Sequence, residues 1–128
     1  MPRGVSIFID VPDLDAGAAF YSRVFGLAEV ARPFPGLVIL EGDGIRLGLN
    51  ARTAGSLPFK GAATGRDYAR HWTPVHCDFE VEDFEETLSC AEAAGATVEA
   101  LYRDEGPRPA AFCADPFGNG FCLMGPRR

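Results

Sequence analysis

The sequence predicts an α+β fold built from two modules of the order β-α-β-β-β. Residues 5–11 alternate apolar and polar side chains, which is typical of a strand with one buried face, and residues 75–81 repeat the pattern. The two segments lie 70 positions apart, and a helical pattern follows each of them. Repetition at a fixed offset indicates two copies of one supersecondary unit.

Each first strand is followed by an amphipathic segment with its own helix start signal. Asp13 is placed to cap a helix whose apolar residues recur at helical spacing as far as Gly26. Asp83 occupies the equivalent position in the second half, with Glu86 three residues later as in a capping box. Gly95 ends the second helical pattern.

Three strand-like segments follow each helix. They cover 28–32, 37–41 and 45–50 in the first half, and 97–102, 110–114 and 120–124 in the second. We therefore expect one domain, 1–128, made of two modules, 1–50 and 75–128. The joining segment 51–74 is long for a structureless loop, so it is either a mobile linker or a functional lid.

Composition and charge exclude several classes of function. The chain has 128 residues with 12 basic and 18 acidic side chains, a net charge of -6. This balance opposes binding to nucleic acid or to an anionic membrane surface. No apolar run reaches the roughly 18 residues of a membrane span, and no apolar targeting segment precedes residue 5. The four cysteines show no CxxC spacing. We expect reduced thiols and a cytoplasmic protein.

Several short motifs share their order with a known superfamily. They lie at 11–14, 20–21, 25–27, 76–83, 95–96, 115–119 and 121–123. Together they resemble the vicinal oxygen chelate superfamily, which includes glyoxalase I, bleomycin-resistance proteins and extradiol dioxygenases. The resemblance implies that the two βαβββ modules have curled mixed sheets around a shared cleft. It also implies a homodimer.

The resemblance implies four metal-ligand positions, one on each of four strands. In this chain they carry Ser6, Arg46, His76 and Cys122. Serine is a weak neutral ligand and Arg46 stays protonated, so this set is poor for a catalytic divalent metal. His76 and Cys122 could hold a soft metal only with help from another residue. We therefore expect no metal and no cofactor.

Strand alternation places a mixed set of side chains on the face opposite the helices. Such a face, with apolar surface and a few convergent polar groups, is typical of a ligand site. The expected ligand-binding cleft is lined by Ser6, Phe8, Asp10, Arg46, Trp72, His76, Asp78, Cys122 and Met124.

Arg46 has two interpretations. It forms an ion pair with Asp78, Glu80 or Asp10, or it binds a carboxylate or phosphate of the ligand, which the planar guanidinium fits well.

Three further residues of the expected cleft also have alternatives. His76 is the one candidate catalytic residue, as a general acid or base, or else it is hydrogen-bonded to a neighbour. Cys122 is a nucleophile activated by His76, or a small apolar filler. Trp72 stacks on an aromatic ligand, or it covers the core or a dimer interface.

These observations predict a metal-free protein that binds and sequesters a small organic ligand, with a role in antibiotic resistance. We expect a cytoplasmic homodimer that acts on neither nucleic acid nor membranes. The alternative is a metal-dependent lyase, isomerase or dioxygenase of the glyoxalase type, with Asp78 or Glu80 joining His76 at the metal.

Overall fold

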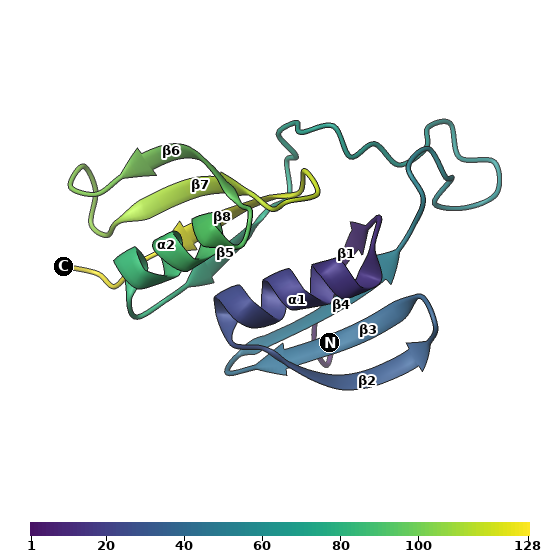
Figure 1. Cartoon of the computed structure of the whole chain (residues 1–128), viewed down its shortest axis with the longest axis horizontal. Helices are drawn as coiled ribbons and strands as arrows, with labels where there is room; N and C mark the ends of the chain where they lie inside the picture. Colours follow the sequence, from purple (N-terminus) through teal and green to yellow (C-terminus); the bar gives the residue numbers. More distant parts are fainter. The chain divides into compact units, whose positions relative to one another are not determined.

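The computed structural model describes all 128 residues and contains two βαβββ modules (Figure 1). The chain divides into two compact units, Met1–Asp67 and Tyr68–Arg128, each with one four-stranded mixed sheet and one helix. The predicted α+β fold of two repeated modules is therefore confirmed. The boundary between the units falls inside the expected joining segment 51–74.

The first unit contains one helix and four strands. In chain order these are β1 (Ile7–Val11), α1 (Leu14–Phe25), β2 (Ala28–Phe34), β3 (Leu37–Gly42) and β4 (Ile45–Ala51). The sheet order is β1-β4-β3-β2, with β1 parallel to β4 and the other pairs antiparallel. Its core is apolar and includes Tyr21, Val38, Leu40, Leu47 and Leu49.

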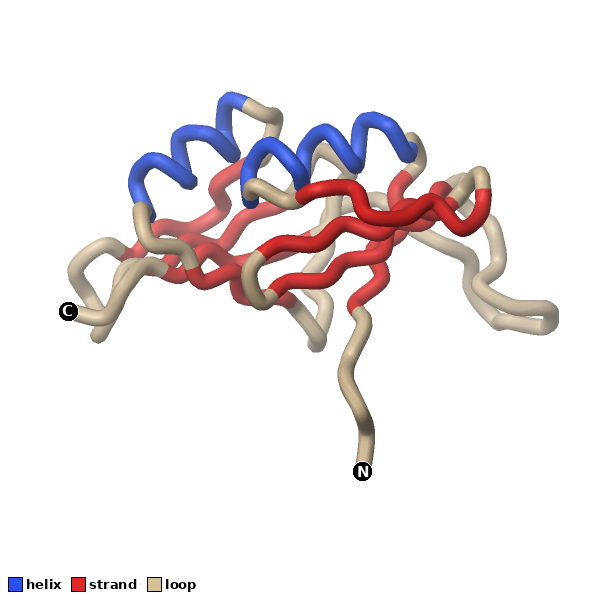
Figure 2. The backbone as a smooth tube through the Cα atoms, turned by 90° about the horizontal axis from the view of Figure 1, so that it is seen from below, coloured by secondary structure: helices blue, strands red, loops and turns tan.

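The second unit repeats this topology. Its elements are β5 (Cys77–Glu80), α2 (Phe84–Ala93), β6 (Thr97–Tyr102), β7 (Ala110–Ala114) and β8 (Gly120–Met124). The sheet order is β5-β8-β7-β6, and β5 is parallel to β8. Within each unit the helix covers one face of the sheet (Figure 2). The opposite face of each sheet carries the polar side chains of the expected ligand-binding cleft.

Both helices begin where the sequence predicts. The carboxylates of Asp13 and Asp83 each accept a hydrogen bond from the backbone N–H three residues later, at 3.0 Å in both cases. This satisfies a donor that the first helical turn leaves without a partner. Both helices are much shorter than the about 20 apolar residues that a membrane span needs. Neither is long or apolar enough to cross a bilayer.

Both first strands start two residues later than predicted. Pairing begins at Ile7 opposite Leu47 and at Cys77 opposite Phe121. Ser6 and His76 therefore lie just before β1 and β5 rather than inside them. The alternating pattern continues beyond the residues that have a partner strand, and for this reason it overestimates the strands.

Residues 52–67 pack with the first unit. The Arg66 N–H donates to the Ser56 carbonyl at 2.8 Å, and the Gly55 N–H donates to the Arg66 carbonyl at 2.7 Å. The Arg66 guanidinium also donates to the Asp10 carboxylate of β1 at 2.6 Å. These bonds close the segment into an ordered loop that is attached to β1.

Candidate functional site

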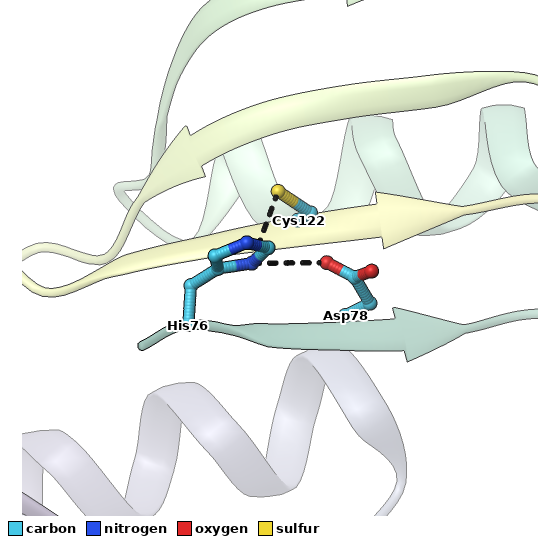
Figure 3. Close-up of side chains that lie close together, drawn as sticks. All are labelled: His76, Asp78 and Cys122. Atoms are coloured by element: carbon cyan, nitrogen blue, oxygen red, sulfur yellow. Dashed lines mark hydrogen bonds and ion pairs between the residues drawn. The ribbon is translucent and has the colours of Figure 1, made fainter. Parts of the chain in front are cut away.

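Three side chains with metal-binding or acid–base chemistry converge on the second sheet, on the face opposite α2 (Figure 3). Asp78 and Cys122 are directly opposite each other in the β5–β8 register, and His76 precedes β5 by one residue. The Nδ1 atom of His76 lies 3.1 Å from the Asp78 carboxylate and 3.9 Å from the Cys122 sulfur. One donor atom from each of the three residues fits within 4.8 Å of the others.

The Cys122 thiol is held in its protonated form. Burial raises its pKa to about 11, and the nearby Asp78 carboxylate acts in the same direction. The side chain is only 4% exposed. Because the thiolate is the reactive form, this arrangement disfavours the interpretation of Cys122 as a nucleophile activated by His76.

Aromatic rings adjoin this cluster. The Trp72 ring lies 4.9 Å from the His76 ring and 5.9 Å from the Phe112 ring, measured between centroids. The Tyr102 ring meets the Phe112 ring edge-on, at 6.1 Å between centroids. Trp72 is 54% exposed and Tyr102 is 45% exposed. We call Trp72, Phe112 and Tyr102 the aromatic platform.

The segment that carries Trp72 is fixed to the sheet by an arginine. Arg70 donates to both carboxylate oxygens of Glu99 on β6, at 2.7 and 2.8 Å, and it also bonds the His71 carbonyl. This pairing lowers the pKa of Glu99 and raises that of Arg70. The guanidinium lies directly on Gly120 of β8, where a Cβ would be 2.7 Å from its nitrogens. Gly120 therefore leaves the space that this ion pair occupies.

The candidate residues of the first unit have local partners. Arg46 forms an ion pair with Glu41, which is directly opposite it on the neighbouring strand β3. Within the first unit Arg46 therefore pairs with Glu41 and not with Asp10, because the β3–β4 hairpin places the Glu41 carboxylate directly opposite it.

The three suggested partners of Arg46 all contact other groups. Asp10 binds Arg66, and Asp78 contacts His76. Glu80 accepts a hydrogen bond from Arg108 at 2.8 Å. The Arg46 guanidinium is half exposed beside Glu41 on the first sheet.

The other expected cleft residues divide between the two units. Phe8 is 52% exposed on β1, and its ring covers Gly48 of β4. Ser6 is exposed just before β1. Met124 is half-buried on β8, opposite Glu80. The second sheet brings together Trp72, His76, Asp78 and Cys122, whereas Ser6, Phe8, Asp10 and Arg46 belong to the first.

The residues at the four implied metal positions do not fit a divalent cation. Ser6 is a weak donor, and Arg46 carries a positive charge beside Glu41. Only His76 and Cys122 offer suitable atoms. The third donor close to these two is Asp78, which is not at an implied ligand position.

Several residues of this site are not evident from the sequence. Arg70 and Glu99 are 29 positions apart, and their pairing depends on how residues 68–72 cross the sheet. Phe112 and Tyr102 belong to strands whose pattern does not identify their exposed face. The closely spaced Gly118 and Gly120 are the one sequence signal that another segment passes over β8.

Comparison with known proteins agrees with this architecture. The family model described as "Glyoxalase-like domain" matches residues 6–124. A search of curated proteins finds no match.

Solved structures with the same fold cover nearly the whole chain. A lactoylglutathione lyase from Agrobacterium tumefaciens is 25% identical with a TM-score of 0.63, covering 97% of this chain and 94% of that one. A glyoxalase-related enzyme from Fulvimarina pelagi is 19% identical with a TM-score of 0.72, over 98% and 89%. The fosfomycin resistance protein FosX from Listeria monocytogenes is 17% identical with a TM-score of 0.75, over 98% and 93%.

Proposed function

The chain belongs to the family of glyoxalase-like domains, and we propose that it binds and sequesters a small organic ligand without transforming it. The observation that carries this proposal is the aromatic platform beside His76. Trp72 is more than half exposed, and Arg70 fixes its segment to the sheet. An exposed, rigidly held aromatic ring provides a stacking surface at low entropic cost.

The charge of the second unit supports a cationic aromatic ligand. Residues 68–128 contain 11 acidic and 5 basic side chains, a net charge of -6, whereas residues 1–67 contain seven of each. Asp78 is 47% exposed, close to the platform, and its contact is an imidazole rather than a guanidinium. A ligand cation could lie over Trp72 and close to this carboxylate.

Ligand binding of this kind does not depend on a metal at the four implied positions. Arg46 would repel a dication there, and Ser6 adds no charge to hold one. The names of similar proteins include both lyases and resistance proteins, so either type of function occurs on this fold. The residues at the four implied positions favour binding over metal-dependent turnover there.

Titration of the purified full-length protein tests the proposal. Trp72 is the single tryptophan, so its fluorescence reports directly on the platform. Bleomycin serves as a cationic aromatic probe, beside a thermal-shift panel of smaller aromatic amines. We expect saturable quenching at one equivalent and recovery of unchanged ligand by mass spectrometry.

Variants show whether the platform is responsible. Trp72→Ala should weaken binding measured by calorimetry at least about tenfold. Phe59→Ala removes another exposed aromatic ring from the first unit and is the matched control. Equal binding by Trp72→Ala and the wild type, or consumption of excess ligand, would contradict the proposal.

A second candidate function is a metal-dependent lyase, isomerase or dioxygenase. The clustering of His76, Asp78 and Cys122 favours it, since three protein donors with an open fourth position are typical of catalytic sites. Assays with the methylglyoxal–glutathione hemithioacetal and with catechol, each with added divalent metal, distinguish the two. Turnover that is abolished by His76→Gln would establish the enzyme.

We also propose that the chain acts as a cytoplasmic homodimer, as the resemblance implies. The four cysteines are free thiols, which agrees with a reducing compartment. Sedimentation at micromolar concentration should give twice the chain mass of 13.7 kDa. A single species at the chain mass would contradict the dimer.

A further inference from the structure

We propose that Trp72, Phe112 and Tyr102 form a partial aromatic cage in the second unit, which binds a methylated ammonium group such as the head of a quaternary amine. The inference rests on the proposed function, because it uses the aromatic platform, and it names the chemical class of the ligand's cationic group. A quaternary ammonium carries its charge under methyl groups and has no N–H to donate. Aromatic faces therefore recognise it better than hydrogen-bond acceptors do.

The three rings lie on one face of the second sheet. Tyr102 of β6 pairs with Ala110, which precedes Phe112 by two positions on β7, so Tyr102 and Phe112 project from the same face. The Trp72 ring lies 5.9 Å from the Phe112 ring and 4.9 Å from the ring of His76, which precedes β5. The sheet order is β5-β8-β7-β6, so Trp72 lies toward β8 and Tyr102 lies on β6, with Phe112 between them.

The rings are inclined to one another rather than coplanar. The plane of Trp72 makes 49° with that of Phe112, and the plane of Tyr102 makes 80°. A flat ligand stacks on one such ring at a time, whereas a rounded methylated ammonium has apolar surface in every direction. Cation–π attraction acts within about 6 Å of a ring centroid, and the centroids of neighbouring rings are 5.9 and 6.1 Å apart. One cation can therefore lie within reach of more than one ring.

Small side chains surround Phe112 on the β6 side. Ala100 is opposite Phe112 on β6, and Ala110 is opposite Tyr102 on β7. An alanine methyl does not rise above the sheet, so neither residue fills the space beside the rings. Trp72 and Tyr102 are 54% and 45% exposed, so a ligand reaches them from solvent without a movement of the sheet.

Two carboxylates of this unit, Glu99 and Asp78, supply negative charge, but their oxygens already have partners. Both oxygens of Glu99 accept hydrogen bonds from Arg70, at 2.7 and 2.8 Å. Asp78 lies 3.1 Å from His76 and accepts a hydrogen bond from the Cys122 thiol. A primary ammonium would compete with these partners for acceptors, whereas a quaternary ammonium needs none. The net charge of -6 on the second unit attracts either cation at long range, so the rings decide between them.

Three matched probes test the inference on the full-length protein. Choline carries a quaternary ammonium, 3,3-dimethylbutan-1-ol has the same shape without the charge, and ethanolamine has the charge without the methyl groups. Trp72 is the single tryptophan, so its fluorescence follows each titration at constant ionic strength. We expect saturable quenching by choline and at least about fivefold weaker binding of the other two probes. Absence of saturable choline binding, or equal binding of the neutral alcohol or of ethanolamine, overturns the cage.

Variants that keep apolar volume but remove an aromatic face assign the rings. Tyr102→Leu and Phe112→Leu should each weaken choline binding at least about threefold and leave binding of the neutral alcohol unchanged. Phe59→Leu removes an exposed ring from the first unit and should leave choline binding unchanged. Tyr102 is at an exposed position, so we expect its variant to fold even where Phe112→Leu does not. Full choline affinity in Tyr102→Leu, or equal fractional losses for choline and the neutral alcohol, contradicts the assignment.

Competition separates this inference from the proposed function. Choline should displace bleomycin and the aromatic amines from the platform. Binding of these ligands through Trp72 without displacement by saturating choline would overturn the cage and leave the proposed function intact. Consumption of the bound amine, with choline still preferred over the neutral alcohol, would overturn sequestration and leave the cage intact.

Discussion

The first and second units have the same element order, but both histidines and all four cysteines lie in the second. The first unit has equal numbers of acidic and basic side chains, and its Arg46 and Asp10 are joined to partners in the same unit. The second has a net charge of -6 and the cluster of His76, Asp78 and Cys122.

This difference shows that the repeated fold does not require repeated chemistry. On the sheet faces that point away from the helices, positions of the two units correspond by the 70-residue offset. The residue types at these positions differ: Ser6 corresponds to His76, and Phe8 corresponds to Asp78. Packing selects the residues that face the helices, so the opposite face can vary without loss of the fold. Four measurements can sharpen or break this comparison.

The largest expected effect concerns the turn before β8. Gly118 has φ +99°, and a Cβ there would overlap the Tyr68 carbonyl oxygen. Gly118→Ala should lower the free energy of unfolding by roughly 3 kcal/mol or more. In the corresponding turn of the first unit Gly44 has φ +71° and open space, so Gly44→Ala should cost about 1 kcal/mol. Urea unfolding measures both, and equal losses would show that no segment is held against Gly118.

The second effect is a loss of stability at alkaline pH that originates in the second unit. Burial raises the pKa of Cys122 to about 11 and that of Cys113 to about 12, from an ordinary value of 9.0. Because the folded state holds these protons more tightly, their contribution is complete below pH 9 and is lost as pH rises toward 11 and 12.

Comparison of the wild type with Cys122→Ala isolates this contribution. Two pKa units correspond to about 2.7 kcal/mol as an upper order of magnitude. We expect the unfolding free energy of the wild type to fall more steeply between pH 9 and 11 than that of the variant. Parallel profiles would indicate that the thiol is not held in its protonated form.

The third effect tests the loop of the first unit. Arg66 is 16% exposed and binds Asp10, so Arg66→Ala should cost about 2 kcal/mol by removing the guanidinium that pairs with a partly buried carboxylate. Thermolysin should then cleave faster near the exposed Leu57 and Phe59. Lys60→Ala changes a charge in the same loop and should leave the cleavage rate unchanged. Unchanged cleavage in Arg66→Ala would show that another contact holds the loop.

The smallest effect compares one ion pair from each unit. Glu99→Gln removes the carboxylate that binds Arg70, and it should cost about 1 kcal/mol and lower the fluorescence anisotropy of Trp72. Glu41→Gln breaks the exposed pair with Arg46 and should change stability by less than about 0.5 kcal/mol.

The Arg70–Glu99 pair also predicts a dependence on acid. Arg70 lowers the pKa of Glu99, so this contribution is present above the ordinary glutamate pKa and is lost as pH falls through the lowered value. The anisotropy of Trp72 should fall with it. The anisotropy of Glu99→Gln should not change over that range, and a change of equal size in the variant would assign the acid effect to another group.

The fold was largely predictable because its signals are local. The N-caps Asp13 and Asp83 and the strand pattern depend on neighbouring residues, and the observed strands agree within a few positions. The pairing of Arg46 with Glu41 was also predictable in principle. The two-residue turn Asp43–Gly44 sets a register in which positions 41 and 46 are opposite.

The rest of the site depends on contacts between distant parts of the chain. Alternation correctly places Asp78 and Cys122 on one face, but it does not show that β5 pairs with β8 in the register that joins them. Arg66 and Asp10 are 56 positions apart, and several other acidic residues were equally plausible partners. Charge pairing at this range follows from the packed structure rather than from spacing.

The closure of each sheet within its own unit has a consequence for synthesis. Every strand of the first sheet finds its partners before residue 67. At translation rates of about 5–20 residues per second, the remaining 61 residues take about 3–12 seconds to make. Sheets whose strands are close in sequence fold faster than this. The first unit can therefore begin to fold before synthesis of the second unit is complete.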